Sequence, residues 1–272
     1  MRVHHVDCAS MCPIARSATN GEGGFFERGV MPAHCLIVET DRHGLVVVDT
    51  GFGEADVADP SGRLGALFAT LVGAFPKRAT TLLGHLARLG LDPNDVRHVV
   101  VTHLDLDHAG GLQDFPKATV HVHANEKNAA LHPTFRERER YRAVHWAHGP
   151  SWQTYDATGE PWRGFAAVRS LVGLPPEILC VPMDGHTRGH WLVAVETAAG
   201  PLVHCGDAYF HRGAVEGTTM PWGVAGFEQL LAWERKKIAG NHARLRELAA
   251  TGEGIRLFSA HDPVELERLQ RG

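Results

Sequence analysis

The sequence contains no long apolar run, and this absence argues against a membrane protein. A membrane-spanning helix needs about 20 consecutive apolar residues, and no stretch of the 272-residue chain approaches that pattern. The first residues, MRVHHVDCASMCP, also lack the apolar core of a secretory signal peptide. We therefore expect a soluble, cytoplasmic protein without membrane contact.

Cysteine is scarce, and the charge is close to balanced. The chain has 5 cysteines, and an odd number in a chain of this length argues against a disulfide framework. Cys8 and Cys12 have no second cysteine pair nearby, so we do not expect a zinc finger. The formal net charge of -4 lacks the basic excess of a nucleic-acid-binding protein.

Tyrosine is rare, with 3 residues, whereas histidine is common, with 19. Because histidines are so numerous, spacing and position must decide which of them belong to a site. The stretch VTHLDLDHAGG, residues 101–111, is distinctive because His103, Asp105, Asp107 and His108 follow an apolar run. The two glycines after them would let the backbone turn tightly as a helix begins.

Short apolar runs alternate with polar turns along the chain, which predicts a mixed α/β fold. We expect strands at 34–40, 44–51, 96–103, 118–124, 177–183, 191–197, 201–207 and 255–262. Leucine spacing and helix-stop residues predict helices at 79–91 and 263–271, and a helical stretch at 226–254 that breaks at Gly240 and Asn241. A hydrophobic fraction of 44% is sufficient for the core of one large domain.

Several predicted strands end in a side chain that can bind a metal. These side chains are Asp49, His103, His190, Asp207 and His261. In mixed α/β folds, strand ends deliver side chains to one edge of the sheet, where ligands bind. Neighbouring loop residues point in different directions, so some could serve one ion and some another, as in two-metal hydrolytic sites.

In this order, the motifs resemble those of the metallo-β-lactamase-fold hydrolases, and the resemblance covers nearly the whole chain. The matching segments are VVVDTG with Asp49, the run from His103 to His108, GHTRGH with His190, HCGDAYF with Asp207 and FSAHDP with His261. Asp105 stands where the family usually has a histidine. The resemblance implies an α+β protein, an αββα sandwich of two mixed β-sheets faced by helices, with residues 1–272 as one domain.

The resemblance also implies a binuclear metal centre with two zinc ions as the expected cofactors. His103, Asp105 and His190 would hold the first ion, Asp107, His108 and His261 would hold the second, and Asp207 would bridge them. Asp49 would orient ligands without binding a metal, and His186 is not the expected ligand position. A carboxylate at 105 can bind zinc, but it can also disfavour the first ion or favour Mn²⁺ or Fe²⁺.

The resemblance further implies that a metal-bound hydroxide hydrolyses a small molecule. The chain looks most like the lactonase branch, so we expect a lactone or another ester-like substrate. Asp107 is the catalytic candidate that steers the hydroxide and protonates the leaving group. Tyr209 is a second catalytic candidate because lactonases have a tyrosine close to this position, and packing at the sheet edge is its alternative. A homodimer is left open.

Residues 132–174 are the most individual part of the chain. They carry seven aromatic residues, Phe135, Tyr141, Trp146, Trp152, Tyr155, Trp162 and Phe165, and the charged run RERERYR. We expect this segment to be a helical, aromatic lid over the metals, which would favour an apolar acyl or ring substrate. The alternative is plain helix packing with a solvated face of arginine and glutamate.

Other functions remain as alternatives. A glyoxalase II-like thioesterase would need a basic patch for its substrate, and the sequence has no clear one. An iron-dependent persulfide dioxygenase shares the expected fold and would be selected by iron and oxygen consumption. The lack of a signal peptide disfavours a β-lactamase, and a metal-free binding protein is the weakest reading of the motifs.

Overall fold

Two β-sheets form the centre of the molecule in the computed structural model, which describes residues 1–156, 159–165 and 169–271. The first sheet has the strand order β1 (Arg2–Asp7), β2 (His34–Glu39), β3 (Leu45–Val48), β4 (Val96–Val100), β5 (Thr119–His123) and β6 (Ser151–Tyr155). The second has the order β11 (Arg256–Phe258), β10 (Gly200–His204), β9 (Trp191–Thr197), β8 (Ile178–Pro182) and β7 (Arg169–Ser170). Each sheet contains both parallel and antiparallel pairs, so both are mixed, as expected.

Strands β2, β3 and β9 are largely apolar on both faces, because the sheets are covered on both sides there. In β2, Leu36 and Val38 belong to the core between the two sheets, whereas Cys35 and Ile37 pack on the outer side of the first sheet. β9 shows the same alternation between the inter-sheet core and the outer side of the second sheet. The period of two along each strand explains why these segments read as continuous apolar runs.

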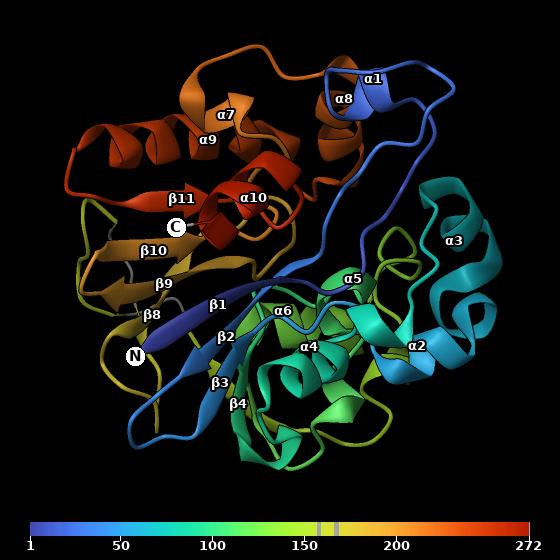
Figure 1. Cartoon of the computed structure of the whole chain (residues 1–272). Coiled ribbons are helices and arrows are strands. Elements are labelled where there is room, and N and C mark those ends of the chain that lie inside the picture. The colour runs from blue at the N-terminus through green and yellow to red at the C-terminus, as the bar shows by residue number, and fades with distance from the viewer. Residues whose placement is uncertain (157–158, 166–168, 272) are drawn as a thin grey trace.

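Helices cover the outer faces of both sheets, which gives the αββα arrangement predicted from the sequence (Figure 1). The helices are α1 (Arg16–Thr19), α2 (Glu54–Ala58), α3 (Ala66–Val72), α4 (Leu82–Leu89), α5 (Leu106–Ala109), α6 (Ala124–Leu131), α7 (Gly213–Glu216), α8 (Trp222–Leu231), α9 (Arg235–Ala250) and α10 (Pro263–Arg271). In Figure 1, α4 and α6 lie on the side of the first sheet, and α7 and α9 lie on the side of the second. None of the helices in the described part of the chain combines the length and apolar character that crossing a membrane requires.

The predicted helical break at Gly240 and Asn241 is wrong. α8 ends at Leu231 and α9 begins at Arg235, so the break comes earlier, and Gly240 lies inside α9. The chain turns there because the backbone N–H groups of Trp233 and Glu234 donate to carbonyls of the 183–190 loop instead of continuing the helix. A glycine in a helix costs about 1 kcal/mol relative to alanine, and the packing of α9 against the second sheet outweighs that cost.

The segment 132–174, expected to form an aromatic lid, divides between the first sheet and the cavity wall, and its residues 157–158 and 166–168 lie outside the described residues. The segment contains β6, which pairs with β5 as a strand of the first sheet. Trp146 is buried in the core on the outer side of that sheet, and Trp152 packs against the same core. Trp146 and Trp152 therefore pack in a core and do not cover the metal position, whereas Phe135 is exposed. The charged run lines the cavity through Arg136, Glu137, Glu139 and Arg140.

Candidate metal centre

Residues 101–111 form a loop and a short helix after β4. His103 and Asp105 lie in the loop, and Asp107 and His108 lie on α5. This turn requires a glycine at Gly110. A Cβ atom there would lie 2.8 Å from the carbonyl oxygen of Gly51 and even closer to a carboxylate oxygen. The fold thus brings the end of β4 against the loop that follows β3.

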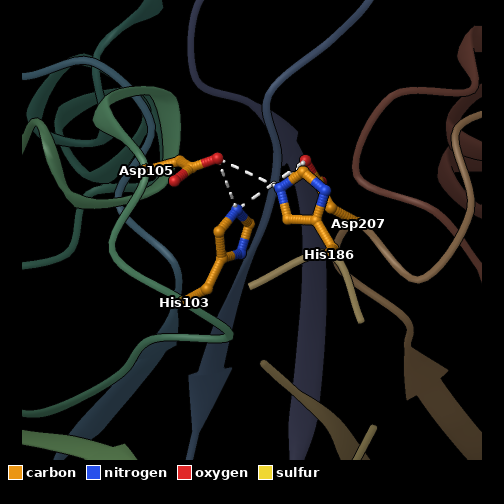
Figure 2. A group of neighbouring side chains, drawn as sticks. All are labelled: His103, Asp105, His186 and Asp207. Carbon is orange, nitrogen blue, oxygen red and sulfur yellow. Dashed lines mark hydrogen bonds and ion pairs between the residues drawn. The ribbon is translucent and has the colours of Figure 1, made fainter. Parts of the chain in front are cut away.

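Seven buried side chains form two adjacent groups that could each hold a metal ion. The first group contains His103, Asp105, His186 and Asp207, and Figure 2 shows their side chains converging on one space. The second group contains Asp107, His108 and His261. Within each group the candidate ligand atoms lie within 4.8 Å of one another. Six of the seven residues expected to bind metal are therefore brought together by the fold.

Asp207 lies between the two groups and faces both with different oxygens. Its Oδ2 is 3.3 Å from Nε2 of His186 and 3.7 Å from Nε2 of His103. Its Oδ1 is 3.2 Å from Nε2 of His108 and 3.1 Å from Nε2 of His261. A carboxylate in this position can contribute one oxygen to each of two ions.

Three histidines have their second ring nitrogen fixed by a neighbour. Nδ1 of His108 lies 2.8 Å from the carboxylate of Asp49, and Nδ1 of His261 lies 2.8 Å from a backbone carbonyl. Nδ1 of His103 is 3.0 Å from the hydroxyl of Thr102, which itself donates to Asp49. Such contacts orient a histidine so that its Nε2 faces the metal position, and Asp49 has the geometry for the orienting role predicted from the sequence.

Unpaired polar atoms show that the residues present fit a metal centre. In the described part of the chain, Nε2 of His103, Nε2 of His108 and Oδ1 of Asp207 are buried without a hydrogen-bond partner. Leaving such atoms unpaired costs about 1–3 kcal/mol each in a folded protein. Imidazole nitrogens and carboxylate oxygens are the donor set that suits zinc and similar divalent ions, so bound ions would satisfy these atoms.

The charges of the centre favour the ionised carboxylates that a metal requires. Burial raises the pKa of Asp207, but the surrounding histidines, His261 and His108 first, outweigh it and hold that pKa well below its ordinary value. Burial alone would lower the pKa of His108, yet the Asp207, Asp107 and Asp49 carboxylates raise it well above its ordinary value.

The expectation for His190 does not match the geometry. Its Nε2 accepts a hydrogen bond from the backbone N–H of Asp207 at 3.0 Å, and its Nδ1 lies 3.0 Å from the carbonyl oxygen of Met183. Both ring nitrogens are therefore occupied by backbone, and His186 takes the place in the first group. GHTRGH offers two histidines, and the one adjoining the strand supports the turn, while the earlier one faces the metal position.

Tyr209 is likewise removed from the position that catalysis would require. Its side chain is fully buried in the core of the second sheet, and its hydroxyl donates to Oε1 of Glu265 at 3.0 Å. The packing alternative is therefore the one that matches the structure. The next residue, Phe210, instead faces the site, with its ring 5.1 Å from that of His261 and 5.7 Å from that of His186.

Arg140 is a residue of the candidate site that the sequence analysis did not single out. Its Nε lies 3.0 Å from Oδ1 of Asp105, in a buried ion pair at the edge of the first group. It comes from the run RERERYR, which we had expected to belong to a lid or a solvated face. Nothing in the local spacing distinguishes Arg140 from the other arginines of this run, because its contacts are to residues far away in sequence.

A cavity of about 320 Å³ opens beside the two groups. Asp105, Asp107, Asp207 and His261 form its inner end. Most of the remaining wall is apolar and includes Met11, Phe68, Phe210, Phe227, Leu230 and Leu231. The site can therefore present polar groups and metals to one end of a small molecule while enclosing an apolar part of it.

Comparison with known proteins agrees with this arrangement. The family model described as the metallo-beta-lactamase superfamily matches residues 28–238. A probable metallo-hydrolase of Mycobacterium tuberculosis is 42% identical over 274 residues, which cover 100% of this chain and 83% of the relative. An N-acyl homoserine lactonase of Bacillus thuringiensis is 26% identical over 242 residues, covering 89% of this chain and 85% of the relative.

Solved structures with the same fold include quorum-quenching lactonases. One is an N-acyl homoserine lactone hydrolase with the product N-hexanoyl-L-homoserine bound at its catalytic metal centre, with a TM-score of 0.71 and 22% identity. That similarity covers 98% of this chain and 95% of the other. A quorum-quenching N-acyl homoserine lactone lactonase has a TM-score of 0.70 and 20% identity, over 97% of this chain and 92% of the other.

Proposed function

Because the chain belongs to the metallo-beta-lactamase superfamily and is a metal-dependent hydrolase, we propose that it hydrolyses lactones or similar esters that carry an apolar group. The observation that carries this proposal is the apolar cavity that ends at the two metal groups. An apolar pocket with a few polar groups at one end suits a small molecule whose reactive carbonyl is polar and whose remainder is apolar. The lactonase relatives support a lactone as that carbonyl group.

We propose that zinc is the ion and that His103, Asp105, His186 and Asp207 hold one ion while Asp107, His108, His261 and Asp207 hold the other. When bound, the two ions would lower the pKa of water and polarise the carbonyl oxygen of the substrate. His186 replaces His190 in this ligand set because its Nε2 lies 3.0 Å from Oδ2 of Asp105 and 3.3 Å from Oδ2 of Asp207.

Asp107 is the residue that we propose moves the proton. Its carboxylate lies at the inner end of the cavity, with Oδ2 3.5 Å from Nε2 of His261. A carboxylate at this point can take a proton from the attacking water and return it to the leaving alkoxide. Phe210 and Phe227 line the same cavity and would hold the apolar part of the substrate away from water.

The test combines elemental analysis of the purified protein with a substrate panel. We expect about two divalent ions per chain and a kcat/KM for a long-chain acyl lactone that is at least ten times that for a matched thioester, aryl ester or phosphoester. Removing the ions with a chelator should abolish hydrolysis, and zinc should restore it. A tenfold preference for the thioester would replace the lactone proposal, and oxygen consumption with a persulfide in an iron-containing sample would replace hydrolysis altogether.

A further inference from the structure

Arg140 lies at the edge of the first metal group. Its positive charge would repel a metal ion there unless a negative group compensated it. Its guanidinium contacts Asp105 through Nε at 3.0 Å and comes within 3.4 Å of Nε2 of His186 through Nη2. No other arginine or lysine in the described part of the chain forms an ion pair with a carboxylate of either metal group. The one residue that departs from the usual motif is therefore the one that carries an arginine partner.

We propose that Asp105 and Arg140 act as one unit that replaces a single neutral histidine in the first metal group. This inference rests on the metal centre proposed above. Nε of Arg140 forms an ion pair with Oδ1 of Asp105 at 3.0 Å without a hydrogen bond, while Oδ2 faces His186 at 3.0 Å and His103 at 3.4 Å. One oxygen is thus left for the ion, and the pair carries no net charge, as a neutral histidine would.

Arg140 is held in place independently of Asp105. Its Nη1 donates to the carbonyl oxygen of His186 at 2.8 Å, and its Nη2 donates to the carbonyl oxygen of Leu231 at 2.9 Å. The planar guanidinium therefore joins the 183–190 loop and the end of α8 to Asp105 in a fixed geometry. A lysine could supply the charge but not these parallel contacts.

The neighbours of Arg140 are anchored to the same loops. Glu137 pairs with Arg188 through two contacts, one of them from Nε at 2.8 Å. The hydroxyl of Tyr141 donates to Glu126, whose carboxylate also accepts from the backbone N–H groups of Leu104 and Gly189. These contacts connect the loop before Asp105 with the loop after His186, so the position of Arg140 is fixed from both sides.

The charge of the pair explains how a carboxylate is tolerated at position 105. Asp105 is buried, and Arg140 places a positive charge beside its carboxylate, with Nε 3.0 Å from Oδ1. Removing one partner of a buried ion pair leaves the other charge uncompensated in the protein interior, which is strongly unfavourable. Changing either residue alone should therefore harm the site more than changing both.

A double-mutant cycle tests the pairing, using Asp105→His, Arg140→Gln and the double variant. Asp105→His alone restores the usual motif but leaves the Arg140 charge uncompensated beside two cations, so we expect at least a tenfold loss of affinity for the first ion. Arg140→Gln alone should also cost at least tenfold, which is the usual effect of losing a group that orients a ligand. The double variant should bind the first ion within threefold of the unaltered protein.

The readouts are metal content by elemental analysis, metal affinity by competition with a chelator, and the melting temperature of the metal-free protein. Arg136→Gln is the matched control, since Arg136 donates to the carbonyl oxygen of Ala232 but pairs with no carboxylate of the metal groups. It should leave metal content unchanged. If the Arg140→Gln protein does not fold, Arg140→Met takes its place in the cycle, because it also removes the charge and keeps a side chain of similar length.

Two results would overturn the inference and a third would overturn its premise. Asp105→His that binds two ions as tightly as the unaltered protein would show that the Arg140 charge is irrelevant to the centre. If the fold loss of metal affinity in the double variant equals the product of the losses in the two single variants, the residues act separately. An unaltered protein that binds no divalent ion would overturn the proposed function itself, and with it this pairing.

Discussion

The carboxylate of Asp49 lies 2.8 Å from Nδ1 of His108 and thereby directs Nε2 of that histidine toward Asp207. Asp49 is fully buried and also accepts from the backbone N–H and the hydroxyl of Thr102. One side chain at the end of β3 thus fixes both the loop after β4 and a candidate ligand on α5. This arrangement leads directly to a prediction.

Asp49→Asn should lower the affinity for the second ion by about 10–100-fold, the usual effect of removing a carboxylate that orients a metal-binding histidine. The asparagine would direct an N–H group at donors from which the carboxylate now accepts hydrogen bonds. Chelator competition measures the affinity. His121→Asn is the control, because His121 is buried in the same sheet but contacts His98 and Tyr155. Equal metal affinity in the two variants would count against the orienting role.

The two histidines of GHTRGH should respond differently to substitution. His186→Asn should remove the first ion, so that metal content falls toward one per chain, because its Nε2 faces Asp105 and Asp207. His190→Gln should keep both ions but lower the melting temperature, since both nitrogens of His190 bind backbone. Elemental analysis and a thermal melt separate the two outcomes. The reverse pattern would return the ligand role to His190.

The cavity wall, and not the aromatic segment, should determine how substrate length affects binding. Phe227→Ala should raise KM for long-chain lactones at least fivefold more than for short ones, because Phe227 lines the cavity. Loss of a contact that is equal in the ground state and transition state appears in KM. Trp152→Ala is the control, since Trp152 packs against the core outside the first sheet, and it should lower stability without any chain-length effect. A chain-length effect in Trp152→Ala alone would restore the lid hypothesis.

The strands and several site residues could be predicted because their signals are local, whereas the sandwich and the two-metal arrangement were implied by the resemblance of the motifs to a known family. Apolar runs ending in Asp49, His103 and Asp207 are visible in the sequence, and the sandwich brings these strand ends together. The continuous apolar runs at β2 and β9 also indicated buried strands, although they could not indicate which face each residue occupies.

The remaining features depend on contacts between distant residues. Arg140 pairs with Asp105 across 35 positions, and no spacing rule gives that contact. His190 was favoured over His186 because it adjoins a strand, whereas its ring turns back onto the backbone of Asp207. Trp146 is an aromatic residue near charged neighbours, and the sequence alone does not distinguish a lid from a core at such a position.

Glu265 should make the stability of the protein depend on pH outside the metal centre. Burial raises its pKa from 4.5 to about 8, with the Asp262 carboxylate adding to the shift. It lies on α10, where it accepts from the hydroxyl of Tyr209 at 3.0 Å and from the backbone N–H of Ser259 at 2.8 Å. The folded state therefore keeps a proton that the unfolded state releases as pH rises above 4.5.

Because the folded-state pKa is the higher one, the stability contribution of Glu265 is fully present below pH 4.5 and is lost as pH rises to about 8. At about 1.4 kcal/mol per pKa unit, the loss is about 5 kcal/mol at most. Glu265→Gln cannot ionise, so its melting temperature relative to the unaltered protein should rise by about 5 °C or more between pH 5 and pH 8. Glu267→Gln, an exposed change on the same helix, should show no such trend. Parallel melting curves for Glu265→Gln and the unaltered protein across this range would mean that Glu265 is already ionised in the folded state.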